Sequence, residues 1–302
     1  MSEKKFKSGF VSVIGRPNVG KSSLINELIG HKVSIVTNKP QTTRNNIRGI
    51  LNVPGEYQIV FVDTPGFHTA KDGIDKLMNS SAFQSLKDTD IILFLAPVDE
   101  KIGKNDLYIL EQLKKQTNIP QFLVLTKADL LPKEALIQKV TEWKKLFNPD
   151  ETILISSTTR KNIDTLLELI LRDLPNDFAF FAPDQITDQP NRFYIKELIR
   201  EQVLLKTGQE VPHSVAVLVD ELEDDGELMQ IRATIFVERD SQKGILIGKN
   251  GKKIQDIKYK VKKELVTIYQ KEVELQLRVK VERDWKKSAS LIKKMGYDKN
   301  KY

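Results

Sequence analysis

A glycine-rich loop near the start of this chain is the first feature that could do chemistry. Residues 15–22 read Gly-Arg-Pro-Asn-Val-Gly-Lys-Ser, after an apolar run at residues 10–14 and before a helix-like run at residues 21–29. The glycines let successive N–H groups face a phosphate, and the helix N-terminus adds its dipole. A chance glycine-rich turn is the alternative. The residues expected to wrap nucleotide phosphates are Gly15, Arg16, Pro17, Asn18, Val19, Gly20, Lys21 and Ser22.

Side chains in and after this loop could hold a magnesium ion. Lys21 is long enough to reach the β- and γ-phosphates, and the hydroxyl of Ser22 can ligate Mg²⁺. Asp63 ends an apolar strand-like run at residues 57–62, where its carboxylate can hold Mg²⁺ through a water. The tetrapeptide formed by Asp63, Thr64, Pro65 and Gly66 therefore completes the predicted phosphate site, with the N–H of Gly66 toward the γ-phosphate.

A polar segment between these two motifs could sense the γ-phosphate. Residues 40–44 read Pro-Gln-Thr-Thr-Arg. A threonine here can ligate Mg²⁺ when a γ-phosphate is present and release it after hydrolysis. Thr43 is the first choice and Thr42 the alternative, so the predicted metal ligands are Ser22, Thr43 and Asp63.

A third motif could select the base. Thr126, Lys127, Ala128 and Asp129 close the apolar run at residues 121–126. The carboxylate of Asp129 can accept hydrogen bonds from guanine N1–H and N2–H₂, whereas adenine would leave it partly unpaired at a cost of about 1–3 kcal/mol. The stem of Lys127 can cover the base plane. A backbone N–H in the Ser156-Ser157 pair could meet guanine O6. A charged turn is the alternative.

In this order the motifs resemble those of the translation-factor-like GTPases. Thr126 stands where an asparagine is usual, and Phe67 stands where Ras-like enzymes carry a water-orienting glutamine. The chain is therefore similar to GTPases in which a phosphate-loop asparagine, here Asn18, helps hold K⁺. Such a cation would neutralise charge developing between the β- and γ-phosphates. The catalytic roles that this resemblance implies fall on Lys21, Asn18, Thr43 and Gly66.

Charge is distributed unevenly along the chain. The net charge is +7, but residues 239–302 carry 19 Lys and Arg against 8 Asp and Glu, whereas the remainder carries 29 against 33. A basic C-terminal part favours a polyanionic partner, with a solvated helix surface as the alternative. Cysteine is absent, which excludes disulfides and cysteine-ligated metals. With neither a signal peptide nor a membrane-spanning run, the predicted location is cytoplasmic.

A second glycine motif lies within this basic part. Residues 244–254 read Gly-Ile-Leu-Ile-Gly-Lys-Asn-Gly-Lys-Lys-Ile, with G-x-x-G ahead of a basic amphipathic helix. KH domains clamp an RNA backbone in this way, whereas a plain corner between helices is the alternative. The residues expected to contact RNA are Gly248, Lys249, Asn250, Gly251, Lys252 and Lys253. A core position is preferred over base stacking for Trp285.

The elements needed to position these motifs indicate two domains. We expect an α/β P-loop GTPase domain at residues 1–175, with a mixed, mostly parallel sheet and helices on both faces. A proline-rich linker at residues 176–190 leads to a smaller α+β domain of the prokaryotic KH type at residues 191–302. Strands are predicted at residues 10–14, 47–53, 57–62, 90–96, 121–126, 152–156, 214–220, 228–238 and 272–282. Helices are predicted at residues 21–29, 71–87, 104–116, 133–147, 162–172, 192–206, 252–269 and 285–295, with a turn at 244–251.

Nearly the whole chain resembles the Era family of bacterial GTPases. That resemblance implies hydrolysis of GTP to GDP and phosphate, assembly of the small (30S) ribosomal subunit, and a KH domain that grips the 3′ region of 16S ribosomal RNA. It also implies peripheral attachment to the inner membrane, for which the sequence carries no amphipathic anchor. One alternative is an RNA-binding module that only binds nucleotide. Another is a GTPase of tRNA modification or of tandem-domain ribosome assembly, which would carry a different partner domain.

Overall fold

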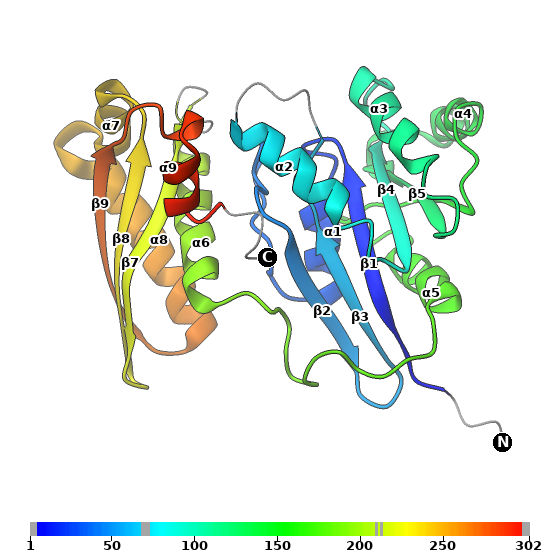
Figure 1. The fold of residues 1–302 in the computed structure, drawn as a ribbon, viewed down its shortest axis with the longest axis horizontal. Helices are drawn as coiled ribbons and strands as arrows, with labels where there is room; N and C mark the ends of the chain where they lie inside the picture. The colour runs from blue at the N-terminus through cyan, green and yellow to red at the C-terminus, as the bar shows by residue number, and fades with distance from the viewer. Residues whose placement is uncertain (1–4, 68–72, 209–210, 212–213, 298–302) are drawn as a thin grey trace.

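Two units joined by an extended segment make up the computed structural model, which describes residues 5–67, 73–208, 211 and 214–297 (Figure 1). The first unit is a six-stranded sheet with helices on both faces. The second is a three-stranded sheet packed against helices (Figure 1).

The sheet of the first unit has the strand order β2-β3-β1-β4-β5-β6. Only the hairpin of β2 and β3, which turns at Pro54-Gly55 as predicted, is antiparallel. The carboxyl ends of β1, β3, β4, β5 and β6 therefore meet at one edge, where ligand sites of open α/β sheets form. The strands are β1 (Lys7–Gly15), β2 (Ile47–Val53), β3 (Tyr57–Asp63), β4 (Ile91–Pro97), β5 (Gln121–Thr126) and β6 (Glu151–Leu154).

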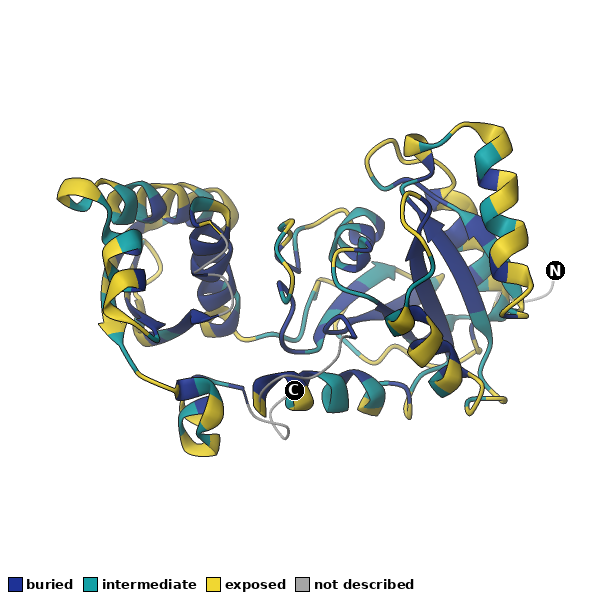
Figure 2. Cartoon of the chain, turned by 90° about the horizontal axis from the view of Figure 1, so that it is seen from above, coloured by how far each residue is buried: buried dark blue, intermediate teal, exposed yellow. Residues whose placement is uncertain are grey.

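Helices cover both faces of this sheet because its strands are apolar on both sides. α1 (Lys21–Ile29) and α5 (Ile163–Asp173) share one hydrophobic core with the strands. α2 (Gly73–Gln84), α3 (Lys104–Leu113) and α4 (Lys133–Lys144) share the core on the other face. Figure 2 shows the strands as the most deeply buried part of the unit. The predicted helix at 71–87 is shorter here, and residues 71 and 72 lie outside the described part.

The segment predicted as a linker is fixed to the first unit. The side-chain oxygen of Gln58 accepts hydrogen bonds from the N–H groups of Phe180 (2.7 Å) and Phe181 (2.9 Å). The N–H of Ile50 donates to the carbonyl of Ile186 at 2.9 Å. The segment thus runs along the β2–β3 edge of the sheet, which gives its backbone groups partners.

The second unit has the order helix–strand–strand–helix–helix–strand, followed by a short final helix. Strands β7 and β8 are antiparallel, β9 lies parallel to β8, and α6 and α8 pack on the sheet. Most of α6 is buried (Figure 2). The elements are α6 (Asn191–Lys206), β7 (Ala216–Asp224), β8 (Leu228–Val237), α7 (Asp240–Ile247), α8 (Lys252–Tyr269), β9 (Glu272–Val281) and α9 (Ala289–Lys294).

Two expectations for the second unit need correction. The turn predicted at 244–251 begins later, because α7 extends through Ile247 and buries Leu246. The helix predicted at 285–295 is interrupted, because the Ser288 hydroxyl accepts the Leu291 N–H and starts α9 anew. Trp285 is buried in the core as expected, and its indole N–H donates to the carbonyl of Ser214 at 2.9 Å.

Candidate functional site

The glycine-rich loop lies between β1 and α1 and forms one wall of a cavity of about 280 Å³. Gly20 has φ 101° and Asn18 has φ 62°, so the loop curls through left-handed backbone positions. The Lys21 ammonium folds back onto the carbonyls of Gly15 (3.2 Å) and Arg16 (2.9 Å). The lining residues are Pro17, Asn18, Gly20, Lys21, Ser22, Ser23, Ile35, Val36, Thr37, Asn38, Gln41, Thr42, Thr43, Gly66 and Lys127.

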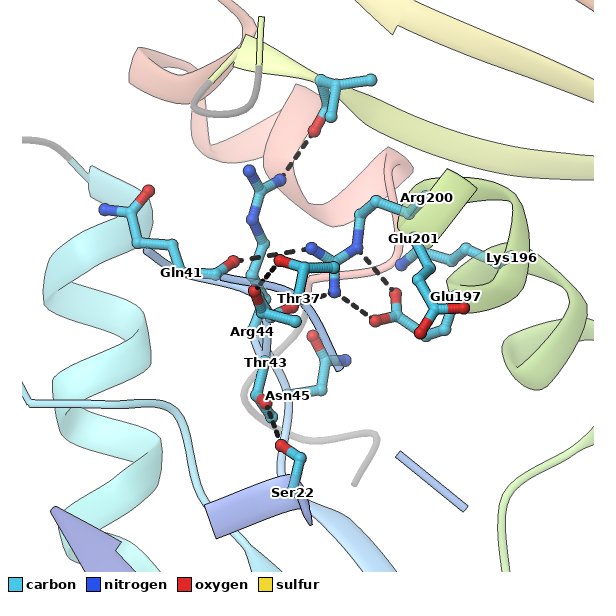
Figure 3. A network of polar contacts seen from close by, with 12 residues as sticks. Ser22, Thr37, Gln41, Thr43, Arg44, Asn45, Lys196, Glu197, Arg200 and Glu201 are labelled. Carbon is cyan, nitrogen blue, oxygen red and sulfur yellow. Dashed lines mark hydrogen bonds and ion pairs between the residues drawn. The ribbon is translucent and has the colours of Figure 1, made fainter. Parts of the chain in front are cut away.

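Three oxygen-bearing side chains meet at the base of this cavity. The Ser22 hydroxyl donates to Asp63 Oδ2 at 2.6 Å, and the Thr43 hydroxyl lies 3.1 Å from Ser22 Oγ (Figure 3). Thr43 also approaches Asp63 Oδ2 at 3.4 Å. Two hydroxyls and a carboxylate are hard donors that suit Mg²⁺. The hydroxyl of Thr42 instead contacts Thr37, so the geometry favours Thr43 as the metal ligand.

Two opposite charges are buried at this point. Burial lowers the pKa of Lys21 to about 8, although the negative charge of Asp63 opposes that shift. Burial also raises the pKa of Asp63, against the hydrogen bond from Ser22 and the charge of Lys21. Each charge is therefore costly in the free protein. Phosphate oxygens beside Lys21 and a cation beside Asp63 would remove that cost.

The segment after Asp63 packs tightly against the phosphate loop. A Cβ at Gly66 would lie 2.5 Å from the backbone nitrogen of Pro17, so only glycine fits. The Thr64 hydroxyl donates to the carbonyl of Val13 at 2.7 Å, and Pro65 is buried. Phe67 is 1% exposed, with its ring centroid 4.2 Å from that of Phe83. Its side chain therefore enters the core and offers the cavity no group that could orient water.

The base motif lies at the carboxyl end of β5. The Thr126 hydroxyl donates to the carbonyl of Val19 at 2.7 Å and so ties this motif to the phosphate loop. Lys127 has φ 58°, and its ammonium lies 3.2 Å from Asp99. Ala128 is buried, whereas Asp129 is exposed on the short 3-10 helix η1 (Ala128–Leu130).

Of the two backbone N–H groups of Ser156 and Ser157, one is already bonded within the protein. The Ser156 N–H already donates to the carbonyl of Lys161 at 3.1 Å. The backbone N–H of Ser157, a half-buried residue in the turn after β6, is then the candidate for the contact with a base.

Acidic residues that sequence reasoning missed brace the phosphate loop. Arg16 Nε lies 2.7 Å from the buried carboxylate of Asp106, and Arg16 Nη1 lies 3.2 Å from Glu100. Glu100 also approaches Lys127 at 3.8 Å, so one acidic segment links the phosphate loop to the base motif. Burial raises the pKa of Asp106, against the hydrogen bond from the Gly103 N–H and the charge of Arg16. In the sequence, Glu100 is marked by its place in a loop after a strand, and Asp106 by a position that can cap a helix.

The residue predicted to hold K⁺ lies on the exposed side of the loop. Asn18 Nδ2 donates to the carbonyl of Asn38 at 3.0 Å. That contact orients the amide and fixes which end of it carries the acceptor oxygen, Oδ1.

The second glycine motif forms a tight turn between α7 and α8. Gly248, Asn250 and Gly251 have φ of 71°, 53° and 73°, and a Cβ at Gly248 would lie 2.7 Å from Lys253 Cβ. Lys249, Asn250 and Lys252 are exposed, whereas Lys253 is half-buried. Bare backbone, exposed cations and the N-terminus of α8 suit close approach of a phosphate chain.

Comparisons with known proteins cover nearly the whole chain. Residues 10–127 match the family profile described as 50S ribosome-binding GTPase, and residues 210–286 match that of the KH domain. GTPase Era of Lactobacillus helveticus is 46% identical over 301 residues, covering 99% of each chain. GTPase Era of Staphylococcus haemolyticus is 42% identical over 292 residues, covering 96% of this chain and 97% of its own.

Solved structures give the same result. A crystal structure of Era in complex with MgGDPNP and nucleotides 1506–1542 of 16S ribosomal RNA superposes with a TM-score of 0.93 at 36% identity, covering 97% of this chain and 99% of the other. A point variant of Aquifex aeolicus Era bound to GDP·AlF4⁻ gives a TM-score of 0.92 at 37% identity, covering 96% of this chain and 99% of the other. These matches confirm the predicted fold class. Within the described residues, no helix has the length and apolar character needed to cross a membrane.

The pKa of Lys21 predicts a pH dependence of nucleotide binding. Above pH 8, Lys21 is mostly neutral in the free protein. Phosphate oxygens raise the pKa of a nearby ammonium, so nucleotide binding in that range must include uptake of a proton by Lys21. Affinity for GDP should be full below pH 8 and then fall by up to about tenfold per pH unit. Titration calorimetry between pH 7 and 9 measures this. Lys21→Arg should bind more weakly but without that slope, and an equal slope in both proteins would contradict the assignment.

The base motif predicts an exchange of nucleotide preference. In Asp129→Asn the amide can donate to the 2-oxygen of xanthine but no longer accepts both guanine donors. We expect GTP affinity to fall by about tenfold or more while xanthosine triphosphate binds better than GTP. Competition binding measures both. Asp184→Asn, at an exposed linker position, is the matched control; tight GTP binding by Asp129→Asn would exclude the guanine contact.

Proposed function

Because the chain belongs to the Era family of GTPases, we propose that it binds the 3′ region of 16S ribosomal RNA through its KH domain and assists assembly of the small ribosomal subunit. As a member of this family the chain hydrolyses GTP. The coupling of a GTPase site to RNA makes it a molecular switch. The observation that carries the proposal is the exposed glycine turn between α7 and α8 of this chain. Its support is that a relative with the same fold was solved with nucleotides of 16S ribosomal RNA bound.

We propose that this site hydrolyses GTP by positioning the phosphates and neutralising their charge, without a side chain that acts as a base. Mg²⁺ would be held by Ser22 and Thr43 directly and by Asp63 through water, and it neutralises phosphate charge when bound. Lys21 contacts the β- and γ-phosphates, and the Gly66 N–H meets the γ-phosphate. Asp129, the Lys127 stem and the Ser157 N–H hold guanine.

The domain boundaries are part of the same proposal. Residues 1–175 form the GTPase domain, residues 176–190 the linker and residues 191–302 the KH domain. We place the protein in the cytoplasm. Peripheral attachment to the inner membrane remains a separate expectation, which fractionation of cells with and without a salt wash tests.

We also propose that K⁺ assists hydrolysis through Asn18. The support is Phe67, whose ring is buried away from the cavity, and the oriented amide of Asn18. Hydrolysis should be roughly tenfold faster in K⁺ than in Na⁺ at equal ionic strength, because a fitted cation neutralises transition-state charge. Phosphate release from Asn18→Ala should show no such difference between the two salts. Equal rates of the parent in both salts would remove K⁺ from the mechanism.

RNA binding is tested at the glycine turn. Lys249→Asp with Asn250→Asp places two carboxylates where a phosphate chain must approach, and aspartate tolerates the left-handed position 250. Affinity for the 1506–1542 fragment should fall by about a hundredfold or more, with GTP affinity unchanged. The exposed pair Lys145→Asp and Asn148→Asp on the GTPase domain changes net charge equally and is the control.

The salt dependence of RNA affinity tests whether the lysines of the turn contact RNA phosphates. The parent should lose RNA affinity steeply with salt because its lysines displace condensed counterions, and the turn variant should show a shallower slope. Unchanged RNA affinity in the turn variant would mean that Gly248–Gly251 is only a corner between helices, and that the basic C-terminal part serves another partner.

A further inference from the structure

The segment that carries Thr43 has no regular structure of its own. Residues 31–46 contain neither helix nor strand, yet residues 42–45 are buried. Buried backbone groups need hydrogen-bond partners. Figure 3 shows where several come from: side chains of α6, in the KH domain, reach the backbone of this segment.

Arg200 makes the central contact. It is fully buried, and its guanidinium donates to the carbonyls of Thr42 and Gln41, the latter at 3.5 Å (Figure 3). The carboxylate of Glu197, one turn earlier on α6, accepts two further hydrogen bonds from the same guanidinium. Burial works to raise the pKa of Glu197, but the charge of Arg200 holds it below its usual value. The fork of Arg200 is thereby fixed in one orientation.

A second arginine crosses the interface in the opposite direction. Arg44, immediately after Thr43, donates from Nη1 to the carbonyl of Val215 at 2.7 Å and to the Tyr297 hydroxyl at 3.2 Å. Its guanidinium also lies 5.6 Å from the centre of the Tyr297 ring. Both neighbours of Thr43 are therefore attached to the KH domain.

A third contact holds the start of the segment on the same helix. Glu201 accepts the backbone N–H of Val36 at 2.9 Å and forms an ion pair with Lys32 at 2.6 Å. Arg200 and Glu201 of α6, together with Arg44, thus determine where the backbone around Thr43 lies. The Thr43 hydroxyl is left 3.1 Å from Ser22, at the predicted magnesium position.

From this geometry we propose that Arg200 is a positioning residue of the nucleotide site, through which the KH domain favours Mg·GTP over GDP. The proposal rests on the function proposed above, in which Thr43 ligates Mg²⁺ only when a γ-phosphate is present. Holding the Thr42 carbonyl orders Thr43 before nucleotide arrives, which reduces the ordering cost of its ligation. GDP depends on the phosphate loop and base motif, so it gains nothing from Arg200. Domain docking and GTP binding then favour each other.

The test compares affinities for two nucleotides in the full-length protein. Arg200→Ala should weaken Mg²⁺-dependent binding of GTPγS by about tenfold, since coupling energies of this kind lie in the five- to 150-fold range. Affinity for GDP should stay within about twofold. Arg200→Lys should recover part of the loss. Arg192→Ala is the matched control, because this arginine of α6 donates to the β7 carbonyls of Val219 and Asp220 within its own unit.

A second variant guards against misfolding, since Arg200→Ala leaves the buried carboxylate of Glu197 without its cation. Arg200→Met with Glu197→Gln keeps the volume and removes both charges. It should show the same selective loss of GTPγS affinity. Equal weakening of both nucleotides, or no change in either, would overturn the role of Arg200. Neither outcome touches the proposed RNA function, which the turn variant tests separately.

Discussion

Buried backbone of the segment around Thr43 must find hydrogen-bond partners outside itself, and the rest of the molecule is arranged around that requirement. An irregular segment satisfies few of its own carbonyl and N–H groups. Here the partners come from α6 of the KH domain, with Arg200 on Thr42 and Glu201 on Val36. α6 is buried on two sides, because its apolar side chains pack in the core of the second unit while Arg200 and Glu201 meet the segment around Thr43. The cavity beside the glycine-rich loop is therefore supported by two domains rather than one.

The protein buries two pairs of opposite charges, which differ in whether the partners neutralise each other. Lys21 and Asp63 are buried where we propose that the nucleotide phosphates and their metal bind, and burial shifts the pKa of each toward its neutral form. Arg200 and Glu197 are equally buried but neutralise each other within the chain. The first pair is costly until ligand arrives, which favours binding. The second pair is satisfied at all times, which suits a fixed support.

The KH domain contacts the GTPase domain through its C-terminal end as well. Trp285, Ile292, Met295 and Tyr297 form one hydrophobic cluster with Ile74 and Met78 of α2. Along the chain, α2 is the first helix after the Asp63–Gly66 motif. Lys249 and Asn250, by contrast, are exposed at the turn between α7 and α8. One domain thus divides its surface between a buried interface with the GTPase domain and an exposed turn suited to a phosphate chain.

The sequence alone determined the features that depend on neighbouring residues. Glycines at fixed spacing, a lysine and serine after them, and apolar runs on either side encode the phosphate loop, its strand and its helix, because turn and strand preferences act locally. The same holds for the Asp63 and Asp129 motifs and the KH turn. Tertiary structure decided which threonine faces Ser22, which serine N–H of the pair is bonded to Lys161, and how Asp106 braces Arg16. It also brought Arg200 to Thr42, 158 positions away. No local pattern encodes such a pair, because the contact exists only once two domains have packed together.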